Sequence, residues 1–241
     1  MRNKSGYIIL YTVILCIVSA VSLASLKQVL GKKQDKNVSL DNKKKILKTV
    51  MNIDTKTPNQ INQIYDDLVS EFVIDYNGKK LEGVLGSSIK VQKERKEKPE
   101  NRKLPLYSIK DQNDKTRIAY YVFPTSGRGL WDAISSYICI GADGKTIKGI
   151  AFDHVGETPG LGARIKADPT ISVRYNDKKL YDETFKPVAV KMMKGEGNNY
   201  EKDPHKVDGM SGATITANGV NDMLKDYAYS YQIFFKSLNN Q

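Results

Sequence analysis

SSYICIGADGKTIKGIAF, residues 135–152, is the strongest secondary-structure signal in the chain. Branched and aromatic side chains alternate with other residues from Ser135 to Ile140, and a second such run extends from Thr146 to Phe152. Ala142-Asp143-Gly144 lies between the two runs and has the composition of a tight turn. The segment therefore predicts an antiparallel β-hairpin.

The neighbouring segments extend this hairpin into a mixed fold. Arg117 to Phe123 alternates in the same way, and Val188 to Met193 is another expected strand, whereas the charged stretch Lys90–Lys103 is typical of an exposed loop. A helix is expected after Thr57-Pro58, with these apolar residues at helical spacing: Ile61, Ile64, Tyr65, Leu68, Val69 and Phe72. A last helix is expected from about Thr216 to Phe235. Since no βαβ rhythm is present, we expect an α+β fold with an antiparallel sheet and flanking helices.

The N-terminus contains the most apolar part of the chain. Residues 7–26 carry no charge and are long enough to cross the roughly 30 Å hydrocarbon core of a membrane as one helix. Residues 1–6 form a short basic tail with Arg2 and Lys4, so a cleaved signal peptide is the competing interpretation. Because the apolar run exceeds the usual signal-peptide core of about 7–15 residues, we favour an uncleaved transmembrane helix.

The remainder of the chain is expected to contain one domain. Residues 27–56 are interpreted as a polar tether (Gln28–Ser39) followed by a short helix (Leu40–Met51), and residues 57–241 as the folded domain. A domain of this length can bury a sizeable core.

Charge and cysteine content exclude several classes of function. The net charge of +11 is spread along the 241-residue chain, and no helix-turn-helix, zinc finger or RNA-binding motif accompanies it, so a nucleic-acid partner is not expected. Cys16 and Cys139 form no cluster with each other or with His154 and His205. Ligation of an iron–sulfur cluster, haem or other metal by this chain alone is therefore not expected. If the protein transfers electrons, an organic cofactor must carry them.

Asp208-Gly209-Met210-Ser211-Gly212-Ala213-Thr214 lies directly before the expected C-terminal helix. The turn presents two hydroxyls with a carboxylate upstream, and backbone N–H groups at a helix N-terminus attract anions. The alternative interpretation is that Ser211, Thr214 or Thr216 caps the helix, as serine and threonine often do. The residues themselves leave both interpretations open.

The same seven residues resemble the flavinylation motif of the covalent FMN-binding domain family: Asp, two residues, Ser or Thr, Gly, Ala, Thr. In that family the FMN phosphate is esterified to the last threonine, which corresponds here to Thr214. Four other positions match the motif: Asp208, Ser211, Gly212 and Ala213. Thr216 is the second candidate hydroxyl, because it also stands close to the start of the helix.

A second block, Gly156-Glu157-Thr158-Pro159-Gly160-Leu161-Gly162, resembles the loop that holds the flavin ring in that family. Its glycines let backbone approach a flat ligand closely, but their spacing is not that of a dinucleotide-binding fingerprint. The resemblance implies that the ring contacts Glu157, Thr158, Leu161 and Gly162.

A third block narrows the resemblance to one branch of the family. Leu104-Pro-Leu-Tyr107 followed by Gly127-Arg-Gly-Leu-Trp131 is similar to the C subunit of the Na+-translocating NADH:quinone reductase. Leu130 and Trp131 are expected to shape an apolar face against the ring together with Leu161. Lys194 matches a lysine that precedes a glycine near the site in the family.

The resemblance implies a membrane-anchored flavoprotein subunit that relays electrons from NADH oxidation towards quinone, coupled to Na+ export by the whole complex. The implied cofactor is FMN, held covalently by a phosphoester at Thr214, with no catalytic residue and no metal in this chain. The implied partners are the A, B, D, E and F subunits of the complex, the membrane, and a flavin transferase that uses FAD and a divalent metal for maturation.

Two alternatives to this function remain open. One is the G subunit of the related ferredoxin:NAD oxidoreductase complex, which shares the threonine motif and the glycine loop. The other is a non-catalytic, membrane-anchored binding module in which Thr214 only caps a helix.

Membrane topology is a separate question, on which charge and resemblance disagree. Four lysines soon after the span favour a cytoplasmic domain by the positive-inside rule: Lys27, Lys32, Lys33 and Lys36. The family implies a flavin domain on the periplasmic side of the bacterial inner membrane. We expect the periplasmic location, because long domains translocate largely regardless of charge.

Overall fold

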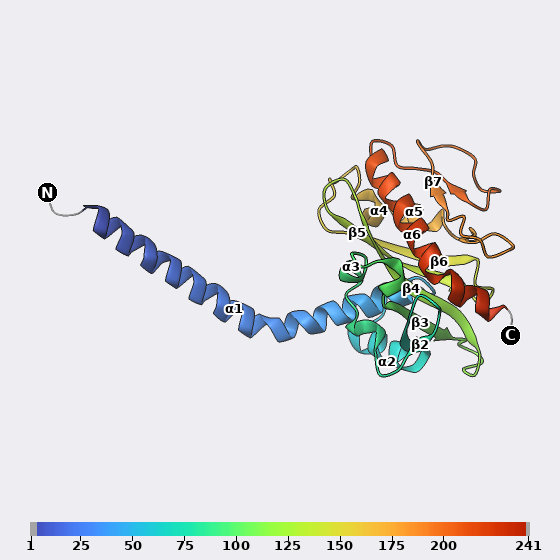
Figure 1. The fold of residues 1–241 in the computed structure, drawn as a ribbon, viewed down its shortest axis with the longest axis horizontal. Helices are drawn as coiled ribbons and strands as arrows, with labels where there is room; N and C mark the ends of the chain where they lie inside the picture. Colours follow the sequence, from blue (N-terminus) through green and yellow to red (C-terminus); the bar gives the residue numbers. More distant parts are fainter. Residues whose placement is uncertain (1–3, 240–241) are drawn as a thin grey trace. The chain divides into compact units, whose positions relative to one another are not determined.

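The structure is a computed structural model and describes residues 4–239. The chain divides into two compact units, Met1–Lys43 and Lys44–Gln241. Figure 1 labels the helices and strands.

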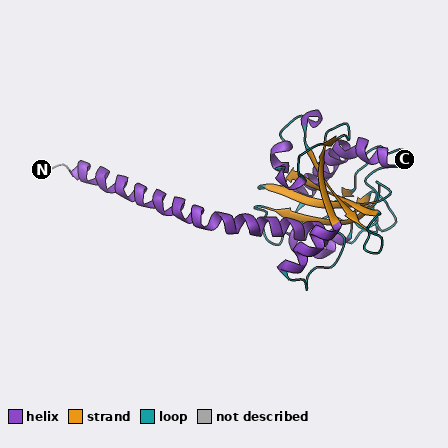
Figure 2. Ribbon diagram, turned by 90° about the horizontal axis from the view of Figure 1, so that it is seen from below, coloured by secondary structure: helices purple, strands orange, loops and turns teal. Residues whose placement is uncertain are grey.

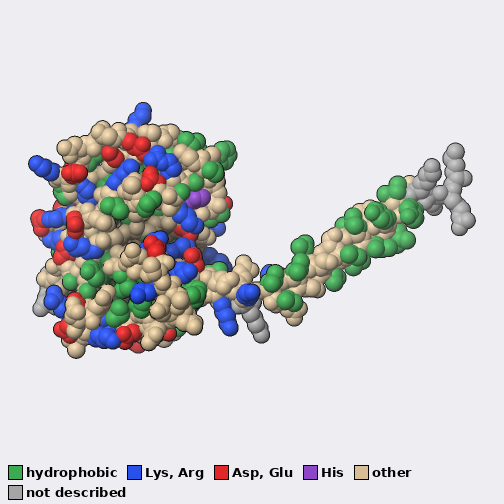
Figure 3. Space-filling model, turned by 180° about the vertical axis from the view of Figure 1, so that it is seen from behind, with side chains coloured by type: hydrophobic (Ala, Val, Ile, Leu, Met, Phe, Trp, Pro, Cys, Tyr) green, Lys and Arg blue, Asp and Glu red, His purple; other side chains and the backbone are tan. Residues whose placement is uncertain are grey.

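The first unit consists of helix α1, which runs from Lys4 to Lys48 and therefore continues into the second unit. Its part Ser5–Gly31 is long and apolar enough to cross a membrane, and its most apolar 18-residue stretch has a mean hydropathy of 2.4. Figure 3 shows hydrophobic side chains along this helix and charges of both signs interspersed over the visible face of the domain. The expected tether after residue 27 is helical instead, because backbone hydrogen bonding continues through its polar sequence.

The second unit is built on a six-stranded sheet with the order β2-β1-β3-β4-β5-β6, in which all neighbours pair antiparallel. Its strands are β1 (Val69–Ile74), β2 (Lys80–Leu81), β3 (Leu104–Lys110), β4 (Ile118–Arg128), β5 (Ala133–Gly141) and β6 (Ile147–His154). A small parallel pair, β7 (Lys191–Met192) with β8 (Lys206–Val207), lies outside the sheet. The α+β class with an antiparallel sheet is thus confirmed.

Helices cover both faces of the sheet, as Figure 2 shows. The longer ones are α2 (Pro58–Leu68) and α6 (Thr214–Leu238). The unit also contains short α-helical and 3-10 segments: η1 (Gly86–Ser88), α3 (Val91–Glu94), η2 (Pro99–Asn101), α4 (Arg164–Ala167) and α5 (Pro169–Val173). The stretch Lys90–Lys103, expected to be a loop, therefore contains two short helical turns.

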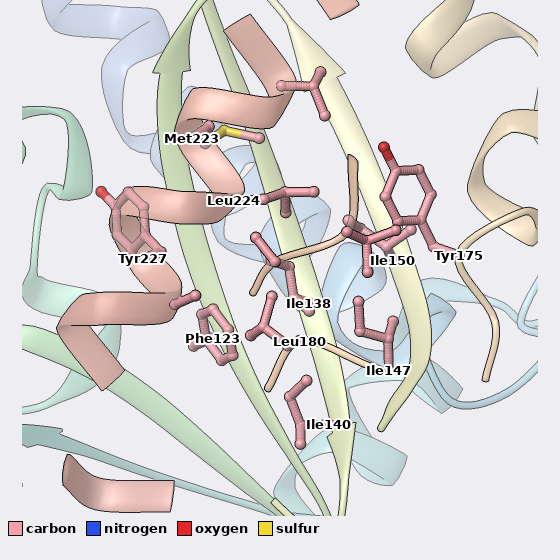
Figure 4. Packing of buried hydrophobic residues seen from close by; sticks show 14 of the residues in the cluster. Phe123, Ile138, Ile140, Ile147, Ile150, Tyr175, Leu180, Met223, Leu224 and Tyr227 are labelled. Carbon is pink, nitrogen blue, oxygen red and sulfur yellow. The ribbon is translucent and has the colours of Figure 1, made fainter. Parts of the chain in front are cut away.

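One face of the sheet packs against α6, where most of the core lies. Figure 4 shows Met223, Leu224 and Tyr227 of α6 beside Phe123 of β4 and Ile138 of β5. Aromatic rings extend this contact along the helix, including Phe123 and Tyr231 at 4.3 Å between centroids. Because α6 is held by so much buried area, its N-terminal turn is fixed relative to the strand ends.

The opposite face is covered by α2 and by the last turn of α1. Ile46 and Leu47 are fully buried, and Thr49, two residues further along, is also buried. At Gly149 of β6 a Cβ would stand 2.1 Å from the Thr49 carbonyl oxygen, so this strand position must be glycine for α1 to pack so closely. The compact unit thus begins at Lys44, upstream of residue 57 where we expected the domain to start.

Two expected elements differ from the structure. The helix after Thr57 begins as expected, with a capping box between Thr57 and Gln60, but it ends at Leu68. Val69 and Phe72 belong to β1, because pairing with β3 overrides a spacing that also suits a helix. The strand expected over Val188–Met193 is reduced to Lys191–Met192, which pairs with the two residues of β8.

Candidate functional site

A cavity of about 280 Å³ lies where the start of α6 meets two loops. One loop, residues 156–162, is here named the ring loop, and the other is the turn at Leu130 between β4 and β5. The cavity is lined by Leu130, Glu157, Thr158, Leu161, Gly162, Gly212, Ala213, Thr214, Ile215 and Thr216. Three segments that are distant in sequence therefore converge on one site.

Residues 208–214, named the attachment segment, connect β8 to α6. The Asp208 carboxylate accepts hydrogen bonds from the backbone N–H groups of Gly197 and Asn198 at 3.0 and 3.1 Å. The Arg174 guanidinium donates to the carbonyl oxygen of Gly209 at 2.7 Å. One side-chain group and one main-chain group of this segment are thus tied to two other parts of the domain before the chain reaches Thr214.

Thr214 is the first residue of α6, and its side chain is exposed on the wall of the cavity. Among residues 4–239 its hydroxyl has no hydrogen-bond partner, and no side chain caps the helix. Thr216 is different, because it is 1% exposed and its hydroxyl donates to Glu157 Oε2 at 2.5 Å. The capping interpretation is therefore wrong for this helix, and Thr214 presents the free hydroxyl of the pair.

Glu157 connects the ring loop to both other segments. Its Oε1 accepts from the backbone N–H of Trp131 at 3.0 Å, and its Oε2 accepts from Thr216. Burial of the carboxyl would raise its pKa, but the hydrogen bonds from the Thr216 hydroxyl and from the backbone of Trp131, Asp132 and Leu130 outweigh that effect and lower the pKa below its ordinary value. The Glu157 carboxylate is therefore ionised without a basic side chain beside it. We call its two hydrogen-bonded contacts, to the Trp131 backbone and to Thr216, the Glu157 latch.

Two glycines allow this latch to form. A Cβ at Gly162 would stand 2.3 Å from Glu157 Oε2 and 2.5 Å from Thr216 Oγ1. A Cβ at Gly129 would stand 2.5 Å from Glu157 Oε1. Any larger residue at either position would therefore displace the carboxylate.

The rim of the cavity is apolar and open to solvent. Trp131 is 66% exposed, and its indole Nε1 donates to the Thr158 hydroxyl at 3.0 Å, which holds the ring beside the ring loop. Leu130, Leu161 and Ile215 are also more than a third exposed. Large apolar side chains exposed together around a cavity are typical of a site that covers an apolar ligand.

Four predicted site residues do not line the cavity: Trp131, Lys194, Asp208 and Ser211. Ser211 is exposed in the attachment segment, and Asp208 acts through the backbone of the loop at Gly197. Lys194 is exposed and precedes Gly195, whose carbonyl oxygen accepts from the Gly209 N–H at 2.9 Å. Among the described residues, no group of acidic, histidine and cysteine side chains is arranged to hold a metal ion.

Sequence reasoning missed two residues of the site. Ile215 lines the cavity, and its signal was an exposed apolar residue between two threonines in the first turn of α6. Arg174 supports the attachment segment from α5's C-terminal cap, and no sequence pattern marks it.

Comparison with known proteins gives this site a family context. Residues 129–228 match the model of the FMN-binding domain family. The C subunit of the Na(+)-translocating NADH-quinone reductase of Vibrio vulnificus is 30% identical over 91% of this chain and 88% of its own. That of Vibrio campbellii is 39% identical over 48% of this chain, and the match spans 41% of that relative.

Two solved structures have the same fold. The C subunit of this reductase from Parabacteroides distasonis superposes with a TM-score of 0.73 at 29% identity, covering 86% of this chain and 96% of that one. NqrC of Shewanella oneidensis superposes with a TM-score of 0.72 at 26% identity, covering 88% and 100%. The chain therefore belongs to the family of C subunits of the Na(+)-translocating NADH-quinone reductase and contains its FMN-binding domain.

Proposed function

We propose that this chain carries FMN esterified through its phosphate to the Thr214 hydroxyl and relays electrons from NADH oxidation towards quinone. The observation that carries the proposal is the free, exposed Thr214 hydroxyl at the N-terminus of a 25-residue helix, on the wall of a cavity inside the matched FMN-binding domain. A phosphodiester keeps a negative charge, and the backbone N–H groups at a helix N-terminus stabilise such a charge.

The residues around the cavity suit both ends of this cofactor. Gly212 has a φ of +78°, so the chain turns sharply beside Thr214, and a Cβ there would stand 2.8 Å from Leu161 Cδ2, so only glycine lets Leu161 lie this close. Leu130, Trp131 and Leu161 offer apolar surface to a flat ring, and Thr158 offers a hydroxyl to its edge. Lys194 is the cation we propose near the site.

The role of the protein is to bind and orient, and we propose no catalytic residue in it. FMN, when bound, supplies the electron-carrying chemistry. The side chains fix its position, and the apolar rim limits access of water to it. A threonine hydroxyl needs activation to act as a nucleophile, and among the described residues no base contacts Thr214, so we propose that a separate flavin transferase makes the ester.

The larger assembly follows from family membership. We propose that the chain works with the A, B, D, E and F subunits, and that Na+ transport is a property of the whole complex. The segment Ser5–Gly31 contains no acidic residue to hold a cation, so we place no ion path in it. The relatives named above are all C subunits of this reductase, which favours this complex over the ferredoxin:NAD oxidoreductase alternative.

We further propose that α1 anchors the chain in the bacterial inner membrane with the flavin domain in the periplasm. Protease added to intact spheroplasts should then digest the region after Leu26 without lysis. Protection until lysis would place the domain in the cytoplasm and overturn this orientation.

Covalent attachment is tested on the full chain purified from its native host. Bound flavin should survive denaturation and appear as in-gel fluorescence and as added mass on the intact protein. Thr214→Ala should abolish both signals, while Thr216→Val should retain them. Fluorescence that persists in Thr214→Ala would refute the attachment site, and loss of all flavin on denaturing the unaltered protein would refute covalent attachment.

A further inference from the structure

The two ends of the ring loop meet at one carboxylate. Asp153 is near the end of β6, just before the loop, and Lys166 lies in α4, just after it. The Lys166 ammonium is 2.8 Å from Asp153 Oδ1. This ion pair closes the loop at its base and so restricts the conformations open to it.

A second lysine approaches the same carboxylate from another element. Lys45, in the last turn of α1, places its ammonium 2.5 Å from Asp153 Oδ2. Burial would raise the pKa of the Asp153 carboxyl, but its contacts with Lys166 and Lys45 outweigh burial and lower the pKa. Each carboxylate oxygen of Asp153 therefore forms an ion pair with a different lysine, one from α1 and one from α4.

From Asp153 the contact continues to the ring loop. The next residue, His154, accepts a hydrogen bond at Nδ1 from the backbone N–H of Glu157 at 3.3 Å. Glu157 in turn latches the loop to α6 and to the backbone of Trp131. The middle of the loop, by contrast, is exposed, and a Cβ at Gly160 would meet nothing within 4 Å.

We infer that Asp153 is a positioning residue for the flavin ring: together with Lys45 and Lys166 it clamps the base of the ring loop, and so sets how firmly the loop holds the ring. The inference rests on the proposed function for the identity of the ligand, but the clamp itself is a property of the chain. The residues that hold the loop thus include one from the end of the helix that leads to the membrane segment.

The two lysines contribute unequally. The Lys45 side chain is 23% exposed and that of Asp153 is 19% exposed, whereas Lys166 is 54% exposed. Ion pairs open to water stabilise little because solvent screens them. Removing Lys45 should therefore loosen the loop more than removing Lys166.

Amide hydrogen exchange tests the clamp on the full-length protein in detergent. Asp153→Asn and Lys45→Gln should raise exchange at Glu157–Gly162 by about fivefold, Lys166→Gln should raise it less, and Lys45→Arg should restore it. The matched control is Asp177→Asn. It removes the 2.7 Å ion pair between Asp177 and Lys148, which lies at the other end of β6, and should leave hydrogen exchange in the ring loop unchanged. Unchanged loop exchange in Lys45→Gln, or an equal rise throughout α6, would overturn the inference.

A second readout separates positioning from general stability. With flavin attached, Asp153→Asn and Lys45→Gln should lower the fluorescence anisotropy of the flavin and shift its midpoint potential in one direction, while Asp177→Asn leaves both as they are. The exchange experiment is repeated with Asp153→Asn and Lys45→Gln in a Thr214→Ala background, which lacks the proposed attachment. A fivefold rise in loop exchange in that background supports the clamp even if the proposed flavin site is wrong. If loop exchange does not rise there, the clamp is refuted, whatever the attachment assay shows.

Discussion

The attachment segment and the ring loop face the same cavity but are held in different ways. In the attachment segment the main chain itself is fixed: the Gly209 N–H donates to Gly195, and its carbonyl oxygen accepts from Arg174. In the ring loop the ties are made by side chains, chiefly Glu157, and the tip is open.

This difference matches two different tasks. A bond to one hydroxyl requires that a single atom be presented in a fixed direction, which a rigid main chain at a helix start provides. Holding a flat ring requires contact over a wide area, which side chains on a looser loop can adjust. We therefore expect changes in the attachment segment to alter whether flavin is attached, and changes in the ring loop to alter its properties.

The largest expected effect is on attachment. Asp208→Ala removes both hydrogen bonds from Gly197 and Asn198 and should reduce flavinylation by about tenfold or more. Ser211→Ala should also reduce it, whereas Glu157→Ala should leave attachment complete. In-gel fluorescence normalised to protein measures this, and complete attachment in Asp208→Ala with none in Glu157→Ala would reverse the comparison.

The next largest difference between the two segments should be the loss of stability when a glycine is replaced by alanine. A Cβ at Gly209 would stand 1.9 Å from the Met193 carbonyl oxygen, so Gly209→Ala must move backbone and should cost about 3 kcal/mol. Gly160→Ala has open space but a φ of +74°, and should cost about 1 kcal/mol. Urea unfolding compares them, and equal midpoints would show that the ring loop is as constrained as the attachment segment.

The Glu157 latch should be visible in the dependence of stability on pH. Because its folded-state pKa lies below the unfolded value near 4.5, the latch stabilises the fold above that pH and is lost as pH falls through the folded pKa. Glu157→Gln should therefore be less stable than the unaltered protein by about 1–2 kcal/mol at neutral pH. Thermal unfolding should show this gap narrowing below about pH 4.5, and a gap that widens with acid would contradict an ionised latch. Asp67→Asn, in an exposed ion pair with Lys115, serves as control.

The smallest expected effect is at the rim. Thr158→Val removes the acceptor for the Trp131 indole, and at so exposed a position should cost about 0.5 kcal/mol or less. Trp131 is the single tryptophan of the chain, so its fluorescence reports this contact directly. Emission should change in Thr158→Val with attachment intact; an unchanged spectrum would show that the hydrogen bond does not hold the indole.

How much of this structure the sequence predicts depends on how far apart in the chain the interacting residues are. The hairpin of β5 and β6 and the helix α6 follow from side-chain periodicity, and every residue that lines the cavity except Ile215 is among the residues that the motifs indicate. The spacing of Val69 and Phe72 suits a helix as well as a strand, and only pairing with β3 distinguishes the two structures there. The support from Arg174 joins residues 34 and 35 positions apart, and no local pattern encodes it.

The docking of the end of α1 has a practical consequence for anyone who shortens the chain. Cys139 lies fully buried on the face that this turn covers, where burial raises the pKa of its thiol to about 12 and the Thr49 side chain is its hydrogen-bond partner. A soluble fragment cut at residue 57 would uncover this thiol and leave it open to labelling and oxidation. A fragment that begins at Lys44 would retain the cover, so the boundary of a well-behaved recombinant domain falls within the helix.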